Sequence, residues 1–175
     1  MDKRTPSTFF IAGTMQGSRR ADNQLNQSYR QQIRSVITRQ YPSATVNCPL
    51  EIMKANLSAH EAEIRNAHAA LATVPIVERL NYEKGVNKLT DMFCDLVAVA
   101  ASCDVCVSYL PNHEASMGTA VEMWNSFANG KLVIAISKMR QNLAVLSCSS
   151  VIVPSVDAFE DLIASGWLEQ NFAKI

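Results

Sequence analysis

Two segments of the chain combine small, hydroxyl and charged residues in patterns that could bind an anion or carry out catalysis. The first, residues 13–20 (GTMQGSRR), follows an apolar run and precedes a helical stretch. Glycines allow close backbone approach to a ligand, N–H groups at a helix start favour an anion, and arginine can bind a phosphate through two hydrogen bonds. The candidate anion-binding residues are Gly13, Thr14, Met15, Gly17, Ser18 and Arg19. The segment matches neither GxGxxG nor a Walker sequence, and an ordinary strand-to-helix turn with solvated arginines explains it as well.

The second segment is residues 111–124 (PNHEASMGTAVEMW), in which Ser116 is suited to cap a helix and Gly118 and Thr119 would lie in its first turn. A polar stripe then follows at helical spacing: Gly118, Glu122, Asn125 and Asn129. The other side is apolar and is expected to face the core: Ala120, Met123, Trp124 and Phe127. Glu122 shares its stripe with the turn that would face a ligand. An ordinary solvated helix face gives the same pattern.

Further carboxylates precede this segment. Asp91 and Asp95 are one helical turn apart, and Asp104 opens the next apolar run. Two carboxylates in one cleft can divide catalytic work when their surroundings separate their pKa values. Solvated helix carboxylates look identical at the level of sequence.

The elements that must position these residues alternate along the chain. Five short apolar runs are continuous rather than alternating, as is typical of parallel strands covered on both faces: 9–12, 44–47, 104–110, 131–136 and 150–154. Helical stretches separate them: 24–40, a helix opened by the capping box Ser58-x-x-Glu61, 86–100, the Glu122 helix, and a last helix capped by Asp157-x-x-Glu160. The pattern predicts a doubly wound α/β fold with a mainly parallel five-stranded sheet, flavodoxin-like or Rossmann-like, binding ligands at the strands' carboxyl ends. Residues 73–84 lack periodicity and are interpreted as an excursion or lid, and no linker divides residues 1–175, which predicts a single domain.

Composition excludes several classes of protein. Sixteen Lys and Arg balance sixteen Asp and Glu among 175 residues, so bulk charge favours binding of neither nucleic acid nor a membrane surface. No apolar run approaches the roughly 18 residues of a membrane span, and the N-terminus lacks the apolar core of a signal peptide, so a cytoplasmic protein is expected. The five cysteines are odd in number and most sit in apolar runs, which indicates a reducing compartment. Cys103-x-x-Cys106 has no second Cys or His pair at metal-site spacing, so no metal site is expected.

Four segments together resemble the nucleoside 2-deoxyribosyltransferase superfamily, and most of all its nucleoside 5'-monophosphate N-glycosidases: GTMQGSR (13–19), CDVCVSYL (103–110), ASMGTAVEM (115–123) and NGKLVI (129–134). Ser-x-Gly-x-x-x-Glu is the most specific part. The resemblance implies that Glu122 is the nucleophile at the anomeric carbon of the sugar, and that the 13–19 loop and Ser116 hold the 5'-phosphate. The resemblance also implies that an Asp on the preceding helix assists near the sugar and base, and Asp95 is the candidate. Asp95 precedes Asp104 by nine residues, whereas the family spacing is usually about eight, so Asp91 is kept as an alternative.

The predicted function is therefore cleavage of the base–sugar bond of a nucleoside or 2'-deoxynucleoside 5'-monophosphate, without a cofactor. The transferase branch has a tyrosine in the first loop, and GTMQGS has none, which favours phosphate recognition. The alternatives are a nucleoside 2-deoxyribosyltransferase and an inactive nucleotide-binding or sensing module. A phosphoribohydrolase is disfavoured because its PGGxGT sequence is absent.

Assembly into a homo-oligomer is also expected. The 73–84 excursion and the side chains of Met123, Trp124 and Phe127 offer more apolar surface than one small sheet needs, and relatives by resemblance are dimers or larger. Asn142 or Ser147 could then reach the neighbouring subunit's site. The alternative is that the three apolar side chains of the Glu122 helix all pack inside their own core.

Overall fold

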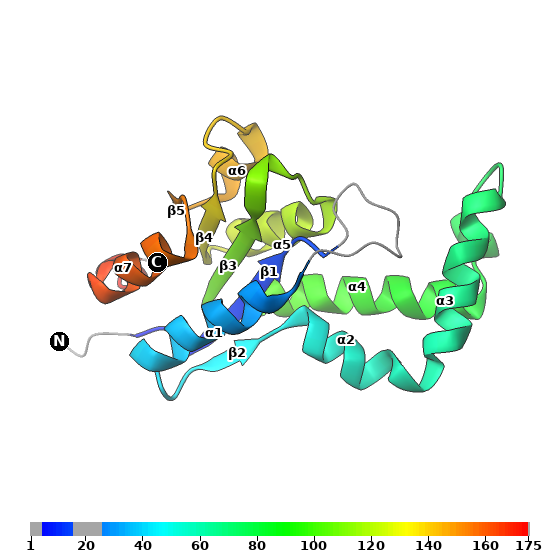
Figure 1. The fold of residues 1–175 in the computed structure, drawn as a ribbon, viewed down its shortest axis with the longest axis horizontal. Coiled ribbons are helices and arrows are strands. Elements are labelled where there is room, and N and C mark those ends of the chain that lie inside the picture. Colours follow the sequence, from blue (N-terminus) through cyan, green and yellow to red (C-terminus); the bar gives the residue numbers. More distant parts are fainter. Residues whose placement is uncertain (1–4, 16–25, 175) are drawn as a thin grey trace. The chain divides into compact units, whose positions relative to one another are not determined.

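The computed structural model describes residues 5–15 and 26–174, and its centre is one parallel β-sheet (Figure 1). The sheet has the order β2-β1-β3-β4-β5, and its strands are β1 (Thr8–Gly13), β2 (Thr45–Asn47), β3 (Val105–Leu110), β4 (Leu132–Ser137) and β5 (Val151–Val153). All four neighbouring pairs are parallel. The predicted doubly wound α/β fold and its flavodoxin-like strand order are confirmed.

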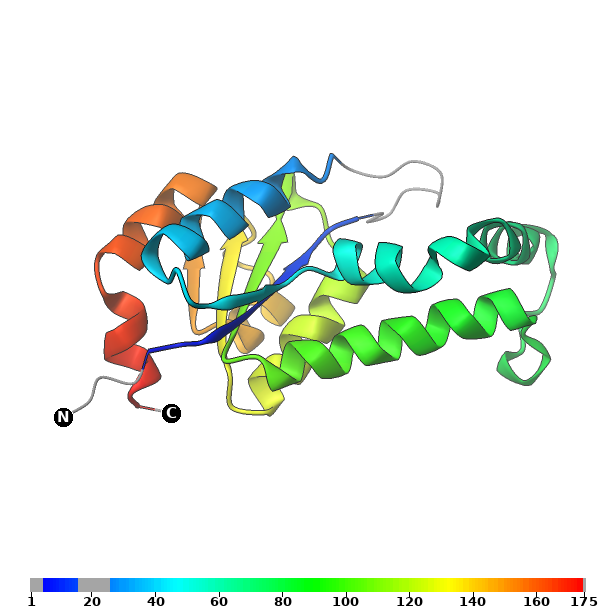
Figure 2. The ribbon, with the colours of Figure 1, turned by 90° about the horizontal axis from the view of Figure 1, so that it is seen from below.

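The sheet is buried on both faces, which explains the continuous apolar runs. In β1, Phe9 and Ile11 join one core cluster, whereas Phe10 and Ala12 join the other. The first cluster packs under α1 (Ser28–Gln40), α7 (Val156–Ala164) and α8 (Trp167–Phe172). The second packs under α5 (Met117–Ala128) and α6 (Leu143–Cys148), on the opposite face (Figure 2). Alternating side chains of each strand therefore fill two separate cores.

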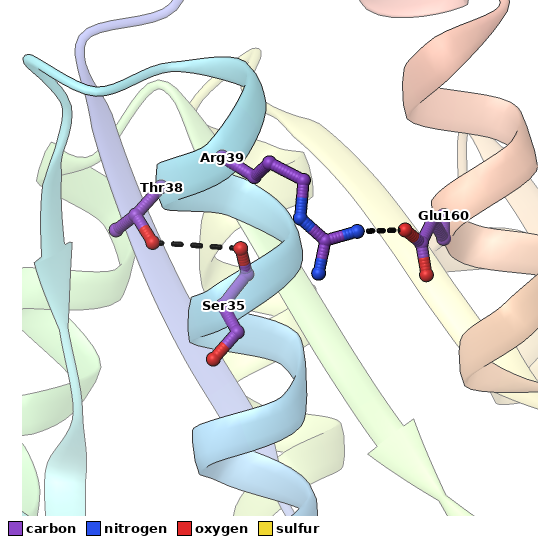
Figure 3. Close-up of polar contacts among 4 residues, drawn as sticks. All are labelled: Ser35, Thr38, Arg39 and Glu160. Carbon is purple, nitrogen blue, oxygen red and sulfur yellow. Dashed lines mark hydrogen bonds and ion pairs between the residues drawn. The ribbon is translucent and has the colours of Figure 1, made fainter.

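The helices α1 and α7 lie side by side on their face of the sheet. An ion pair between Arg39 and Glu160 joins them, and Thr38 near the end of α1 bonds back to the backbone of Ser35 (Figure 3). Glu160 therefore serves a helix contact. The predicted cap Asp157-x-x-Glu160 is wrong: Ser155 has the extended backbone of an N-cap and accepts a hydrogen bond from Ala158 N at 3.1 Å.

Contacts divide the chain into two compact units, residues 1–48 with 97–175, and residues 49–96. The second unit is helical and contains α2 (Pro49–Leu57), α3 (Glu61–Ala70) and most of α4 (Lys84–Ser102). Gly85 lets α4 approach α3 closely, since a Cβ there would lie 2.9 Å from Glu63 O. Residues 74–83 contain only the short 3₁₀ turn Arg79–Asn81, as their lack of periodicity predicted. The single domain stays a prediction.

The predicted capping box at Ser58 is wrong. The chain reaches Ser58 already helical from α2, with Leu57 at φ −108° and ψ −9°, and residues Ser58–His60 continue as a 3₁₀ turn. A capping serine needs an extended backbone, which this continuity denies it. α3 instead begins at Glu61 without a side-chain cap. Within the described ranges, no helix has the length and apolar character to cross a membrane.

Candidate active site

Glu122 lies on the side of α5 that faces the sheet. The buried side chains of this helix recur at i, i+3, i+4 and i+7: Thr119, Glu122, Met123 and Ser126. Only 6% of Glu122 is exposed. The solvated helix face considered for Glu122 is therefore contradicted, because Glu122 is buried and α5 packs against β1, β3 and β4.

The orientation of α5 that buries Glu122 also shows that the predicted core face of this helix is partly wrong. Met123 is buried as expected, but Trp124 and Phe127 are 56% and 43% exposed, and their rings lie 6.0 Å apart. Asn125 is only partly buried and donates to Val97 O at 2.9 Å. The alternative in which Met123, Trp124 and Phe127 all pack inside the core is wrong, and the homo-oligomer stays a prediction.

The N-terminus of α5 is built as the sequence predicts. Ser116 has extended backbone, and its Oγ accepts hydrogen bonds from Thr119 N at 3.4 Å and Thr119 Oγ1 at 3.0 Å. Helix geometry leaves the N–H groups of Met117 and Gly118 without intrahelical acceptors. These groups, at the positive end of the helix dipole, suit an anionic ligand.

The end of β1 forms a second wall of the site. Thr14 N donates to Tyr109 O at 3.2 Å, which continues the β1–β3 pairing one residue beyond the strand. The side chain of Thr14 is fully buried, and its Oγ1 has no hydrogen-bond partner in the part of the chain described. Met15 is partly exposed. The predicted loop residues Gly17, Ser18 and Arg19 lie outside the described residues.

Gly13 is required by the ring of Tyr29 on α1. A Cβ on Gly13 would lie 2.4 Å from Tyr29 Oη, so only glycine admits this ring. Tyr29 stacks on Tyr109 with ring centroids 4.2 Å apart, and its hydroxyl donates to Thr14 O at 3.4 Å. Tyr29 thereby packs against the β1 end that carries two candidate ligand-binding residues.

Arg30 is a residue that the sequence analysis missed. It is buried, with 5% exposed, and donates from Nη1 to Ile11 O at 2.7 Å and from Nη2 to Gly13 O at 3.1 Å. Its Nε donates to Gln27 Oε1 at 2.8 Å. The available signal was spacing, since Arg30 precedes the buried Ile33 and Ile37 at i+3 and i+7 on one helix face.

The surroundings of Glu122 favour its protonated form. Burial raises the pKa of Glu122 to about 8, although the charge of Arg30 acts in the opposite direction. Among the described residues, no hydrogen bond reaches the carboxyl group. Burial also raises the pKa of Tyr29, so its phenol is neutral and acts as a donor. At neutral pH the site therefore holds a neutral carboxyl group near a buried cation.

Other predicted site residues lie elsewhere in the fold. Asp91 and Asp95 are exposed side chains of α4 within the second unit, so an assisting role beside Glu122 stays a prediction. Asn142 caps α6 by accepting from Val145 N at 3.2 Å, and Ser147 is exposed on the same helix. Their contribution to a neighbouring subunit also stays a prediction.

A separate hollow of about 360 Å³ lies where the segments after β3 and β4 meet. It is lined by His113, Lys138, Met139, Arg140, Gln141 and Asn142. Asn112 and His113 both have positive φ, 52° and 61°, which is uncommon for residues other than glycine. His113 is the last residue of the short 3₁₀ turn Pro111–His113 that follows β3.

The described cysteines are free thiols, and no group of three His, Cys, Asp or Glu side chains within residues 5–15 and 26–174 could hold a metal ion. Cys103 accepts a hydrogen bond from Asn47 Nδ2 at 3.3 Å, and burial raises the pKa of its thiol. Cys94 is exposed on α4 and does not act as the buried apolar residue that its surroundings suggested.

Comparison with known proteins gives structural relatives only. No protein-family model matches the chain, and a search of curated protein sequences finds no match. A 2-deoxyribosyltransferase from Bacillus psychrosaccharolyticus matches with a TM-score of 0.53 at 16% identity, covering 88% of this chain and 90% of that one. A conserved protein from Enterococcus faecalis V583 matches with a TM-score of 0.51 at 15% identity, covering 92% and 99%. The Clostridium botulinum CMP N-glycosidase BcmB gives a TM-score of 0.44 at 11% identity, covering 90% and 98%.

The first two matches establish the fold. The chain has the fold of a nucleoside 2-deoxyribosyltransferase, so the resemblance drawn from the sequence motifs is confirmed at the level of structure.

Proposed function

We propose that this protein is an N-glycosidase that cleaves the base–sugar bond of a nucleoside or 2'-deoxynucleoside 5'-monophosphate. The observation that carries the proposal is the buried carboxyl group of Glu122, which no hydrogen bond reaches among the described residues and which lies one turn beyond the start of α5. A carboxylate so placed can reach the sugar of a ligand whose anionic group is held at the helix start.

The chemistry follows the pattern of a retaining glycosidase. The ionised carboxylate of Glu122 forms a bond to the anomeric carbon, and the carbon–nitrogen bond breaks with its electron pair passing to the base, which takes up a proton. Water then attacks the same carbon, releases the sugar 5'-phosphate and regenerates the carboxylate. A second base in place of water gives transfer, so a deoxyribosyltransferase uses the same residues.

The phosphate is assigned to the end of β1 and the start of α5. The hydroxyl of Ser116 and the N–H groups of Met117 and Gly118 would supply donors at the positive end of the helix, with Thr119 orienting Ser116, and residues 13–19 would supply backbone N–H groups and the Arg19 guanidinium. We assign Asp95 to assist near the sugar and base, as the family resemblance implies. Asn142 or Ser147 would reach this site from a neighbouring subunit of a homo-oligomer.

Incubation with ribo- and 2'-deoxynucleoside 5'-monophosphates and the matching nucleosides, with free base measured by chromatography, tests the proposal. We expect base release from a monophosphate and far slower release from its nucleoside. Arg19→Ala should raise KM for the monophosphate and barely change the nucleoside reaction, whereas the matched control Arg39→Ala, on the ion pair between α1 and α7, should change neither.

The outcomes separate the rival functions. Equal kcat/KM for monophosphate and nucleoside would contradict phosphate recognition and favour a nucleoside transferase, which an added acceptor base would reveal. Nucleotide binding by calorimetry without any base release would identify an inactive sensing module.

A further inference from the structure

Among the strands of the described residues, none pairs with one side of β1 at the point where the site begins. The pairing of β1 with β2 ends at Phe10 and Asn47, whereas its pairing with β3 continues to Gly13 and Tyr109. Ser7 O accepts from Thr45 N, so the carbonyls of alternate residues beyond it, including Ile11 and Gly13, face the β2 side. Past the end of β2 these buried carbonyls need other donors.

Arg30 supplies those donors. Its two terminal nitrogens bond to Ile11 O at 2.7 Å and Gly13 O at 3.1 Å, at the spacing of successive carbonyls on one strand edge. The planar guanidinium, which presents its N–H groups as a rigid fork, therefore takes the place of the missing strand. This contact holds Gly13, a candidate ligand-binding residue, directly.

The charge of Arg30 is buried, and no anion among the described residues contacts it. Its three hydrogen bonds go to neutral acceptors, and none of the carboxylates in the described ranges forms an ion pair with it. Burial of a lone cation is costly, and a nearby negative group offsets the cost. Glu122, equally buried, is the carboxyl group whose pKa the charge of Arg30 lowers.

We propose that Arg30 is the positioning residue of this site: it fixes the end of β1 and supplies the positive charge that supports the ionised form of Glu122. The part that Arg30 plays in catalysis rests on the function proposed above. In the described residues, Glu122 is also faced by Tyr29 from α1 and by Cys106 from β3. Burial raises the pKa of both groups, so both are neutral and Arg30 provides the charge.

A double-mutant cycle tests the proposal without requiring turnover. The free energy of unfolding is measured in urea for the wild type, Arg30→Gln, Glu122→Gln and the double variant, at pH 5 and pH 9. We expect a favourable coupling between the two residues at pH 9, where Glu122 is ionised, and a much smaller one at pH 5. Equal coupling at both pH values would overturn the electrostatic role.

Carbon-13 NMR titration of the Glu122 carboxyl group gives the second readout. In Arg30→Gln its midpoint should move upward by about one pH unit, which corresponds to about tenfold lower kcat/KM below the midpoint. Arg30→Lys keeps the charge but cannot bond both carbonyls at once, so it should titrate close to the wild type while unfolding at lower urea concentration. If Arg30→Gln does not fold, Arg30→Lys still tests the proposal, because lower resistance to urea with an unchanged titration separates the contact with the β1 carbonyls from the charge, and a shifted titration would contradict the role of the charge.

Arg39→Gln, on the same helix, is the matched control and should leave the titration unchanged. An unmoved titration in Arg30→Gln would overturn the proposal. Absence of base release in the wild type would instead refute the proposed function, and the titration would still decide the role of Arg30.

Discussion

A carboxyl group lies at each end of the strands, at an amino edge formed by their amino ends and a carboxyl edge formed by their carboxyl ends. The two groups differ in hydrogen bonding and in burial. At the amino edge, Asp104 Oδ2 accepts from Ser7 N at 2.8 Å, Ser7 Oγ at 3.0 Å and Thr8 N at 2.9 Å. At the carboxyl edge, Glu122 is more deeply buried and no described donor reaches it.

The pKa values record this difference. Partial burial acts to raise the pKa of Asp104, but the hydrogen bonds from Ser7 and Thr8 outweigh it and hold the pKa below its usual value. For Glu122 burial dominates and the pKa rises to about 8. Asp104, which accepts three hydrogen bonds, helps to join β1 to β3. Glu122, which is buried without a described donor, lowers the stability of the fold when it ionises. A buried carboxyl group with a raised pKa, such as Glu122, is typical of a functional site, where the group acts on a ligand.

The largest expected effect is on activity, where substitution of Glu122 and substitution of Asp104 should give different results. Glu122→Gln should lower kcat for base release by several orders of magnitude, because an amide cannot form the glycosyl ester. Asp104→Asn, the matched carboxylate control, should stay within about threefold of the wild type. Steady-state assays of free base compare the two variants, and similar losses in both would remove the distinction between the edges.

The second effect is on stability at alkaline pH. Glu122 has a pKa near 4.5 when unfolded and about 8 when folded, so the folded state binds the extra proton and stability falls as pH rises between these values. Glu122→Gln does not titrate and should therefore be more stable than the wild type at pH 9, by on the order of 4 kcal/mol. Urea unfolding from pH 4 to pH 9 measures this difference. A wild type at least as stable as the variant at pH 9 would show that Glu122 is not strained by ionisation.

The smallest effect has the opposite sign. Asp104→Asn should lower the free energy of unfolding by about 1–3 kcal/mol at pH 7, since charged acceptors for Ser7 and Thr8 are lost. Because the folded pKa of Asp104 is lowered, its contribution is present above the unfolded pKa and is lost as pH falls through the folded value. The difference from the wild type should therefore shrink at pH 3. The exposed Asp161→Asn is the control, and an equal loss there would contradict a specific role for Asp104.

The sheet was predictable because burial on both faces leaves a continuous apolar signal in each strand, as in residues 9–12 and 104–110. The cap at Ser116 was predictable from local chemistry, since a serine before a helical pattern satisfies the same N–H groups in any fold. These features depend on neighbours in sequence. They do not depend on which side of a helix meets the sheet.

The burial of Glu122 and the role of Arg30 were not predictable for that reason. The stripe of α5 that holds Glu122 is polar and the stripe with Trp124 and Phe127 is apolar, yet packing turns Glu122 inward and leaves the two rings exposed. Arg30 looks like a solvated helix charge until the length of β2 leaves two carbonyls without donors. The burial of Glu122 and the hydrogen bonds of Arg30 both depend on strands that are distant in the sequence.

The strand order also has a consequence for synthesis on the ribosome. β1 pairs with β3 across a long stretch of sequence, and Ser7 and Asp104, which join those strands, are 97 residues apart. The nascent chain must therefore emerge beyond β3 before the apolar segment Phe9–Ala12 gains its central partner. Until then only the three residue pairs with β2 are available to it. A chain arrested before β3 presents an unpaired apolar strand edge, which is the form in which this protein should depend most on chaperones.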